Sequence, residues 1–447
     1  MSPHLELLIL STFHPLWPPE RQRILELAGV VTDWDAFISL AALNQVEPKV
    51  FMALTQCGAL GALPELPRQH LLSVAARVKE VNEQRLQKAR SVFGALQERG
   101  IPVCVLKGVL FGETVYAEPG YKRMNDVDFL VRREDIARLP PIYSELGYLP
   151  IAERVGRRRD LQLRVSHHLP PYVSVDLRCV LGTQWGLKSP LLGMHIDTGA
   201  MWRRACAFDF YGLSLQRLSA TDNLFHLCIH LGRFKSGLRD VMDIYNLARA
   251  APMEVDYDLF ARLVRDAGAE DLAYHALTLA HRVCPSSDFE RVASELAPRV
   301  SRFMRETVEK KTRELTVLVR LCSGYLSTIE KAISELNATE RAPDKLRRFV
   351  ALWRHVLVPP PEEARRLCFS PDATGLSNWM VPIQAPISIL RALGAEIGFP
   401  LLGLLALKMA VDIAVTALNP HAWRTEAASS LGGLSFQDLQ RLKDAIY

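Results

Sequence analysis

The spacing of hydrophobic residues divides the chain into helical regions on either side of a segment rich in short strands. Residues 20–100 carry apolar side chains three and four positions apart, which is typical of amphipathic helices, and Gly100 stands where the last of these helices should end. Between residues 101 and 181 short apolar runs alternate with helical stretches. From Thr221 to about residue 340 the helical spacing returns. The pattern therefore predicts an α/β unit enclosed by helices.

The elements expected within this unit follow the order strand, helix, strand, helix and then further strands. The helices are expected over 107–118 and 133–147, the second of them broken near Pro140 and Pro141. The strands are expected over 101–106, 126–131, 148–155, 161–169 and 172–181. This order favours a mixed sheet. The predicted fold class is therefore α+β, with a mixed β-sheet flanked by N-terminal and C-terminal helical regions.

Changes in the pattern also predict how the chain is divided. An N-terminal helical region, an α/β core, a helical domain and an apolar helical extension are expected over 1–100, 101–218, 219–358 and 359–447. A proline-rich connector, "VPPPEEARRLCFSPDATG", marks the last boundary.

The most apolar segment of the chain, 397–418, lies in this extension. Pro400, Lys408 and Asp412 interrupt it, so its unbroken runs fall short of the roughly 20 residues that a transmembrane helix needs. We expect a buried helix pair or an interfacial helix here and no transmembrane span. Contact with a membrane surface through 383–418 stays open as an alternative.

Two aspartates stand two positions apart in "YKRMNDVDFLV", inside a run that otherwise resembles a buried strand. On a strand Asp126 and Asp128 share one face, and Val127, Phe129 and Val131 share the other. Carboxylates beside a core need a partner that compensates their charge. The pair therefore predicts a bound cation or an ion pair at this strand.

A third aspartate repeats the arrangement in "VSVDLRC", where Asp176 alternates with apolar residues. If its strand neighbours the first one, three carboxylates converge on one patch and repel one another strongly. A pair of divalent cations is the usual compensation, and oxygen ligands without cysteine select Mg²⁺ or Mn²⁺ over zinc. Ion pairing with Arg123, Arg132 and Arg133 is the structural alternative.

Upstream of this pair, the sequence "VCVLKGVLFGE" passes from a strand directly into a helix. Lys107 and Gly108 lie at the junction, where backbone amides can bind an anion and glycine allows close approach. Arg123 offers a planar fork to a phosphate oxygen. Carboxylates for a metal beside a phosphate-binding turn are typical of phosphoryl or nucleotidyl transfer.

The succession "GIPVCVLKGVLFGETVY…YKRMNDVDFLVRREDIARL…LGY…HHLPPYVSVDLR" resembles the uncharacterised nucleotidyltransferase family of the polymerase-β-like superfamily. The resemblance extends outward to "DWDAFISLAALNQVEP" and "HLCIHLGRFKSGLRDVMDIYNL" and covers roughly residues 30–250. It implies a minimal nucleotidyltransferase core and transfer of a nucleoside monophosphate from an NTP. It also implies Asp126 and Asp128 as metal ligands, Asp176 as the third carboxylate, and Lys107-Gly108 at the phosphate turn.

Two positions depart from the pattern of the superfamily. Val109 follows Gly108 where a serine is usual, so a hydroxyl that contacts phosphate is missing, and Arg178 stands where many members have histidine. A catalytically degenerate module that senses nucleotide or binds protein is therefore the alternative function. The absent hydroxyl favours that alternative, whereas the three carboxylates argue against it.

Residues on the acceptor side are harder to choose from sequence. The candidates are His168, His226, His230 and Arg239. His226 and His230 share a helical face at i, i+4, but no third zinc ligand accompanies them, so a packed or substrate-facing pair is expected. A small metabolite, a modified peptide or protein, and tRNA all remain open as acceptors.

Composition changes this picture little. The chain has 447 residues, 49% hydrophobic and 23% charged, as in soluble globular proteins, and a formal net charge of +5 does not indicate nucleic-acid binding by itself. Its eight cysteines include no C-x-x-C pair and indicate a reducing compartment. Because the N-terminus lacks the pattern of a secretory signal, a cytoplasmic location is expected.

Overall fold

The protein is described here by a computed structural model. It describes residues 2–150, 169, 171–174, 179–187, 194–231, 237–300, 305, 308–309, 312 and 342–357. The described residues up to position 312 belong to one compact unit, and helix α18 (Ala342–Leu357) belongs to a second. The apolar segment 383–418 lies outside the described residues. Among the helices that are described, none has the length and apolar character needed to cross a membrane.

Helices form the first hundred residues of the chain, as the apolar spacing predicted. They are α1 (Pro3–Leu10), α2 (Pro18–Val30), α3 (Trp34–Asn44), α4 (Glu47–Gln56), the short 3₁₀ helix η1 (Leu60–Ala62) and α5 (Glu65–Glu98). Gly100 follows α5 with φ +68°, a left-handed conformation that favours glycine. Helix α1 was not predicted; the Ser2 side chain accepts a hydrogen bond from the amide of Leu5 and caps it.

In the described part of the chain a mixed sheet of seven strands follows, which confirms the predicted fold class. Its strands are β1 (Cys104–Val105), β2 (Val127–Leu130), β3 (Tyr148–Pro150), β4 (Tyr172–Ser174), β5 (Val180–Gln184), β6 (Cys206–Phe210) and β7 (Leu213–Arg217). Their spatial order is β3-β4-β5-β2-β1-β7-β6. Strand β2 runs parallel to β5, and β1 runs parallel to β7, while the other neighbours are antiparallel. The β6–β7 hairpin was not predicted.

Short helices connect the strands. They are α6 (Lys107–Thr114), η2 (Pro119–Tyr121), η3 (Arg133–Arg138), α7 (Leu139–Glu145) and α9 (Thr198–Arg204). The prediction of a helix over 133–147 that is broken near Pro140 and Pro141 is confirmed, because η3 ends at Arg138 and α7 begins at Leu139. The two prolines occupy the first turn of α7, where a missing N–H costs no hydrogen bond, so the helix begins there.

The expected strand over 172–181 is a hairpin. The amide of Ser174 donates to the carbonyl of Cys179 at 3.0 Å, and Tyr172 pairs with Leu181 in antiparallel register. The chain therefore reverses between β4 and β5. As a result β4 does not neighbour β2, because β5 lies between them. Residues 151–168, where another strand was expected, lie outside the described part of the chain.

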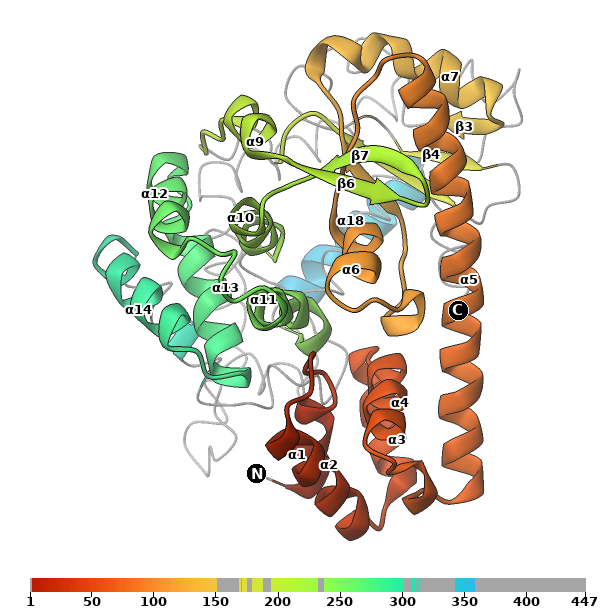
Figure 1. Ribbon diagram of the computed structural model, residues 1–447, viewed down its shortest axis with the longest axis vertical. Coiled ribbons are helices and arrows are strands. Elements are labelled where there is room, and N and C mark those ends of the chain that lie inside the picture. The colour runs from red at the N-terminus through yellow and green to blue at the C-terminus, as the bar shows by residue number, and fades with distance from the viewer. Residues whose placement is uncertain are drawn as a thin grey trace. The chain divides into compact units, whose positions relative to one another are not determined.

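Among residues 220–300 that the structure describes, five further helices follow the sheet: α10 (Ala220–Leu231), α11 (Leu238–Ala250), α12 (Tyr257–Ala267), α13 (Glu270–Val283) and α14 (Ser287–Leu296), and then the 3₁₀ helix η5 (Ala297–Arg299). One continuous hydrophobic core includes side chains of the N-terminal helices, the sheet and these helices. In it Phe93 of α5 packs edge-on against Phe129 of β2, with ring centroids 5.2 Å apart. Figure 1 shows α5 running beside the sheet and reaching the N-terminal helices. The division into four regions remains a prediction.

Candidate functional site

The carboxylate of Asp128 lies at the centre of the sheet on β2, a strand whose four residues are all buried. Only 8% of Asp128 is exposed. Its Oδ2 lies 2.9 Å from Nζ of Lys107, and its Oδ1 accepts a hydrogen bond of 3.3 Å from Nε2 of Gln184. The structure therefore brings together Asp128 and Lys107, two residues predicted from separate motifs. In this state the partner of the carboxylate is an ammonium group.

Gly182 makes room for that carboxylate. It pairs with Asp128 in the parallel register of β2 and β5, so a side chain at either position would project from the same face of the sheet. A Cβ built on Gly182 would collide with Oδ1 of Asp128. Glycine weakens a strand interior and often marks a close approach of this kind. Gly182 was not among the residues predicted from sequence, and the signal for it was the lone glycine in the strand "VLGTQW".

The predicted phosphate turn lies where β1 passes into α6. Leu106 precedes the helix, and Lys107 begins it with φ +49°, a left-handed conformation uncommon for a residue with a side chain. A Cβ on Gly108 would lie 3.2 Å from Cγ of Met124, so the turn packs closely against the segment before β2. The expected strand-to-helix junction is thus confirmed, and its lysine points to Asp128.

The other two carboxylates of the predicted trio are Asp126 and Asp176. Asp126 is half-buried and directly precedes β2, two residues from Asp128. Asp176 lies outside the described residues, between Ser174 at the end of β4 and Cys179 before β5. No group of three metal-ligating side chains occurs in the described part of the chain. Carboxylate oxygens are ligands that Mg²⁺ and Mn²⁺ prefer, so the side-chain chemistry of Asp126 and Asp128 suits such an ion.

Two buried side chains of α5 hold the segment that leads into Asp126. Asn82 donates from Nδ2 to the carbonyls of Pro119 (2.5 Å) and Lys122 (2.8 Å), and its Oδ1 accepts from the amide of Met124 at 3.3 Å. Arg85, one turn further along α5, donates to the carbonyl of Met124. Asn82 is 0% and Arg85 2% exposed. The backbone before the aspartate pair is therefore fixed by side chains almost forty residues earlier.

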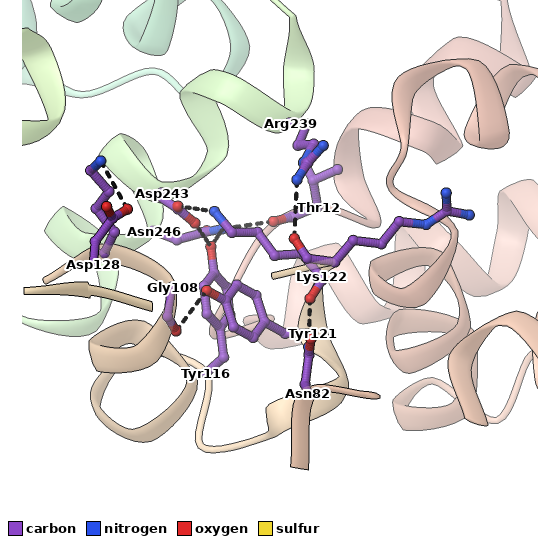
Figure 2. A network of polar contacts seen from close by, with 12 residues as sticks. Thr12, Asn82, Gly108, Tyr116, Tyr121, Lys122, Asp128, Arg239, Asp243 and Asn246 are labelled. Atoms are coloured by element: carbon purple, nitrogen blue, oxygen red, sulfur yellow. Dashed lines mark hydrogen bonds and ion pairs between the residues drawn. The ribbon is translucent and has the colours of Figure 1, made fainter. Parts of the chain in front are cut away.

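A buried ionic network connects this segment to helix α11. Lys122 pairs with Oδ2 of Asp243, and Tyr116 donates to Oδ1 of the same carboxylate at 2.9 Å. The ring of Tyr116 stacks on that of Tyr121 with centroids 4.0 Å apart, and the Tyr121 hydroxyl donates to the carbonyl of Gly108 at 3.2 Å (Figure 2). Burial, with the nearby Asp243 carboxylate, raises the pKa of Tyr116 and Tyr121. Both hydroxyls therefore remain protonated donors.

Two predicted arginines face the N-terminal helices. Nη2 of Arg123 lies 3.2 Å from Oε1 of Glu47, the first residue of α4. Arg239 donates to the side chain of Gln45 and, at 3.0 Å, to the carbonyl of Arg123. Arg123, expected at a phosphate, thus has a carboxylate partner in this structure. Arg239, expected near the acceptor, lies against the backbone that leads to the aspartate pair.

The histidine candidates contribute less to this geometry. His226 is buried in α10 and His230 is exposed one turn later, with ring centroids 6.2 Å apart. Their shared helical face is confirmed, but a role toward an acceptor stays a prediction. His168 lies outside the described residues.

Asn82, Arg85 and Asp243 were not among the residues chosen from sequence. Asparagine, arginine and aspartate on a helix usually face solvent, so their residue types did not single them out. Only their burial against a segment that is distant in the sequence reveals that they hold this segment in place. No local signal could have found them.

A buried lysine borders the network. Lys49 of α4 is 2% exposed, and its Nζ lies 4.7 Å from the ring centroid of Tyr116. Burial lowers the pKa of Lys49 to about 7, with Arg249 adding to this effect and the Asp243 carboxylate opposing it. The amine therefore loses its charge near neutral pH, within contact distance of the tyrosine that bonds Asp243.

Lys49→Met is expected to change how stability depends on pH. Because the pKa of Lys49 is lower in the folded state, the unfolded chain binds one more proton between about pH 7 and pH 10, and stability rises with pH there. The free energy of unfolding of Lys49→Met minus that of wild type should therefore decrease by up to about 1.4 kcal/mol per pH unit across that window. Below pH 7 this difference should stay constant. Urea unfolding at several pH values measures this difference.

The control for this experiment is Lys79→Met, since the Lys79 side chain is 50% exposed. Subtracting the pH dependence that Lys79→Met shows leaves the part that comes from burial of Lys49. A difference for Lys49→Met that varies with pH no more than that for Lys79→Met would contradict the lowered pKa.

Comparison with known protein families finds that a family model described as uncharacterised nucleotidyltransferase matches residues 31–285. Comparisons with curated proteins and with solved structures find no match. The matched stretch is more than half of the chain. It contains Gln45 between α3 and α4, the Lys107–Asp128 pair and Asp243 of α11.

Proposed function

Because this chain belongs to the uncharacterised nucleotidyltransferase family, we propose that it transfers a nucleoside monophosphate from an NTP to a hydroxyl or phosphate of an acceptor. The observation that carries this proposal is the contact of 2.9 Å between Lys107, at the start of α6, and Asp128, in the buried centre of the sheet. It joins the proposed phosphate turn to the proposed metal-binding strand. A carboxylate placed so deeply, with glycine opposite to make room, is unusual for a purely structural role.

Asp126 and Asp128 would hold Mg²⁺ or Mn²⁺, with Asp176 as the third carboxylate. When bound, the ion supplies positive charge to phosphate oxygens as they gain negative charge during transfer. Gln184 orients the Asp128 carboxylate through its hydrogen bond to Oδ1. Gly182 leaves the space that this orientation needs.

Lys107 and Gly108 would bind the phosphates of the NTP. The Lys107 ammonium compensates Asp128 in the structure described here, and it can exchange this carboxylate for a phosphate oxygen once a metal takes over the compensation. Gly108 allows the backbone to approach the phosphate. Val109 cannot supply the hydroxyl contact that the superfamily usually has, so the backbone and Lys107 carry this binding.

In the proposed reaction an acceptor oxygen attacks the α-phosphorus of the NTP and forms a new P–O bond. The bond between the α-phosphorus and the oxygen bridging to the β-phosphate breaks, and pyrophosphate leaves with its electron pair. The acceptor proton passes to a carboxylate, for which Asp176 is the candidate. Arg239 is the described residue that we place toward the acceptor, because it lies against the segment before Asp126.

The experiment that tests this function combines binding with turnover. Purified protein is incubated with each of the four NTPs, with and without Mg²⁺, and bound nucleotide and released pyrophosphate are measured. Mass spectrometry of molecules co-produced with the protein then searches for an added nucleotide mass. We expect Mg²⁺-dependent binding and such an adduct.

Two other outcomes have distinct meanings. Nucleotide binding without pyrophosphate or adduct would favour the alternative, a degenerate nucleotide-sensing module with the same fold. Absence of Mg²⁺-dependent binding for all four NTPs would contradict the nucleotide site itself.

A further inference from the structure

One short segment, residues 119–124, contacts both the phosphate turn and the backbone that leads into the aspartate pair, in addition to the strands β1 and β2 that carry them. This segment contains η2 and ends two positions before Asp126. Its backbone bonds to Asn82 on one side, and its Tyr121 side chain bonds to Gly108 on the other. Displacing the segment would therefore move both halves of the site.

Asn82 uses both polar ends of its amide on this one segment. Two carbonyls accept from Nδ2 and one amide donates to Oδ1, so the side chain cannot rotate without losing several hydrogen bonds. Because Asn82 is fully buried, water cannot replace these bonds at no cost. This is the arrangement expected of a side chain that sets a backbone position.

Tyr121 joins the same segment to the phosphate turn. Its ring is fully buried beneath Tyr116, and its hydroxyl donates to the carbonyl of Gly108 at 3.2 Å. Its Cε1 would lie 3.6 Å from a Cβ on Gly112, so the ring also supports the next turn of α6. Figure 2 shows the Tyr121 hydroxyl directed at the Gly108 turn, while Tyr116 reaches Asp243.

We propose that Asn82 and Tyr121 are positioning residues of the nucleotidyl-transfer site, Asn82 for the metal-binding aspartates and Tyr121 for the phosphate turn. The proposal rests on the proposed function. It goes further because it assigns the two side chains to different binding steps, although neither contacts metal or nucleotide. The assignment follows from which atoms each side chain touches: Asn82 bonds the backbone that enters Asp126, and Tyr121 bonds the backbone of Gly108.

The test separates the two steps by measuring binding without turnover. Mn²⁺ affinity is measured from the electron paramagnetic resonance signal of free Mn²⁺, and NTP affinity is measured in saturating Mn²⁺. Asn82→Ala should weaken Mn²⁺ binding about 10- to 100-fold, the range typical of residues that orient metal ligands. Tyr121→Phe should leave Mn²⁺ binding unchanged and weaken NTP binding about 3- to 10-fold, the effect of one neutral hydrogen bond.

Matched controls exist for both variants. Asn223→Ala removes another buried asparagine, whose Nδ2 donates to the carbonyl of Leu218 at 3.0 Å. Tyr245→Phe removes another buried tyrosine hydroxyl, which bonds Thr12. Both should bind Mn²⁺ and NTP within twofold of wild type. Should Asn82→Ala unfold, Asn82→Ser keeps a small polar side chain in the same space and is measured in its place.

The results distinguish this proposal from the proposed function. If wild type binds Mn²⁺ and NTP, and Asp128→Asn loses Mn²⁺ binding while folded Asn82 and Tyr121 variants bind like wild type, the positioning role is overturned and the proposed function stands. If both variants weaken the same step equally, the division of roles is overturned. If wild type binds neither Mn²⁺ nor NTP, both proposals fail.

Discussion

Asp128→Asn is expected to lower Mg²⁺-dependent nucleotidyl transfer by roughly 10²–10⁴-fold, the equivalent of several kcal/mol of charge stabilisation by a bound metal. The substitution keeps the shape of the side chain but removes the negative charge that compensates Lys107 and would hold the ion. Pyrophosphate release, or formation of the nucleotide adduct, measures the loss. Metal binding measured separately should fall in parallel.

The fold should survive this change. Removing one partner of this buried ion pair costs about 3 kcal/mol, so the thermal midpoint should fall without loss of the folded state. Asp135→Asn is the matched control: Asp135 is 6% exposed and its Oδ1 lies 2.8 Å from Nη1 of Arg138, outside the site. It should cost similar stability and keep activity. If Asp128→Asn is as active as wild type, the Asp128 carboxylate has no role in the mechanism.

Gly182→Ala is expected to reduce turnover about 10²-fold, because its methyl group would occupy the position of Oδ1 of Asp128. The carboxylate must move to relieve the collision, and a displacement of about 1 Å at a catalytic group costs of this order. Overpacking should also lower the free energy of unfolding by about 1–3 kcal/mol. Enzyme assays at saturating NTP and Mg²⁺, with urea unfolding, measure both effects.

A second glycine provides the control for this experiment. A Cβ on Gly94, in α5, would meet nothing closer than 3.9 Å, so Gly94→Ala should keep full activity and stabilise the helix by about 0.5–1 kcal/mol. Equal activity in Gly182→Ala and wild type would show that Asp128 tolerates a different position. The close register of β2 and β5 would then not matter for catalysis.

Much of the site could be anticipated because its chemistry is carried by short, local patterns. The junction of β1 and α6 at Lys107 was visible as an apolar run followed by a helical one, and Asp128 stood out as a charge within a buried strand. That these two residues meet depends on the antiparallel pairing of β1 with β2, in which Val105 lies opposite Phe129. A mixed sheet was expected, but this register was not.

Other parts of the site could not be anticipated from local sequence. Arg123 had the position and chemistry for a phosphate contact, yet Glu47 lies beside it in the structure. An ion pair between residues 76 positions apart has no local pattern. The same holds for Asn82 and Arg85, whose polar character alone indicated a solvent-exposed face of α5.

The hydrophobic periodicity of the chain by itself determined most of the helices, the position of the strands β1 and β2, and that a mixed sheet lies between helical regions. This is possible because a helix or strand buries one face, so its apolar residues recur along the sequence with the period of that element. The tertiary structure alone decided that β5 lies between β4 and β2, that Gly182 faces Asp128, and that Asn82 holds the segment before Asp126. These pairings join residues distant along the chain, and their geometry depends on packing over the whole core rather than on any local preference.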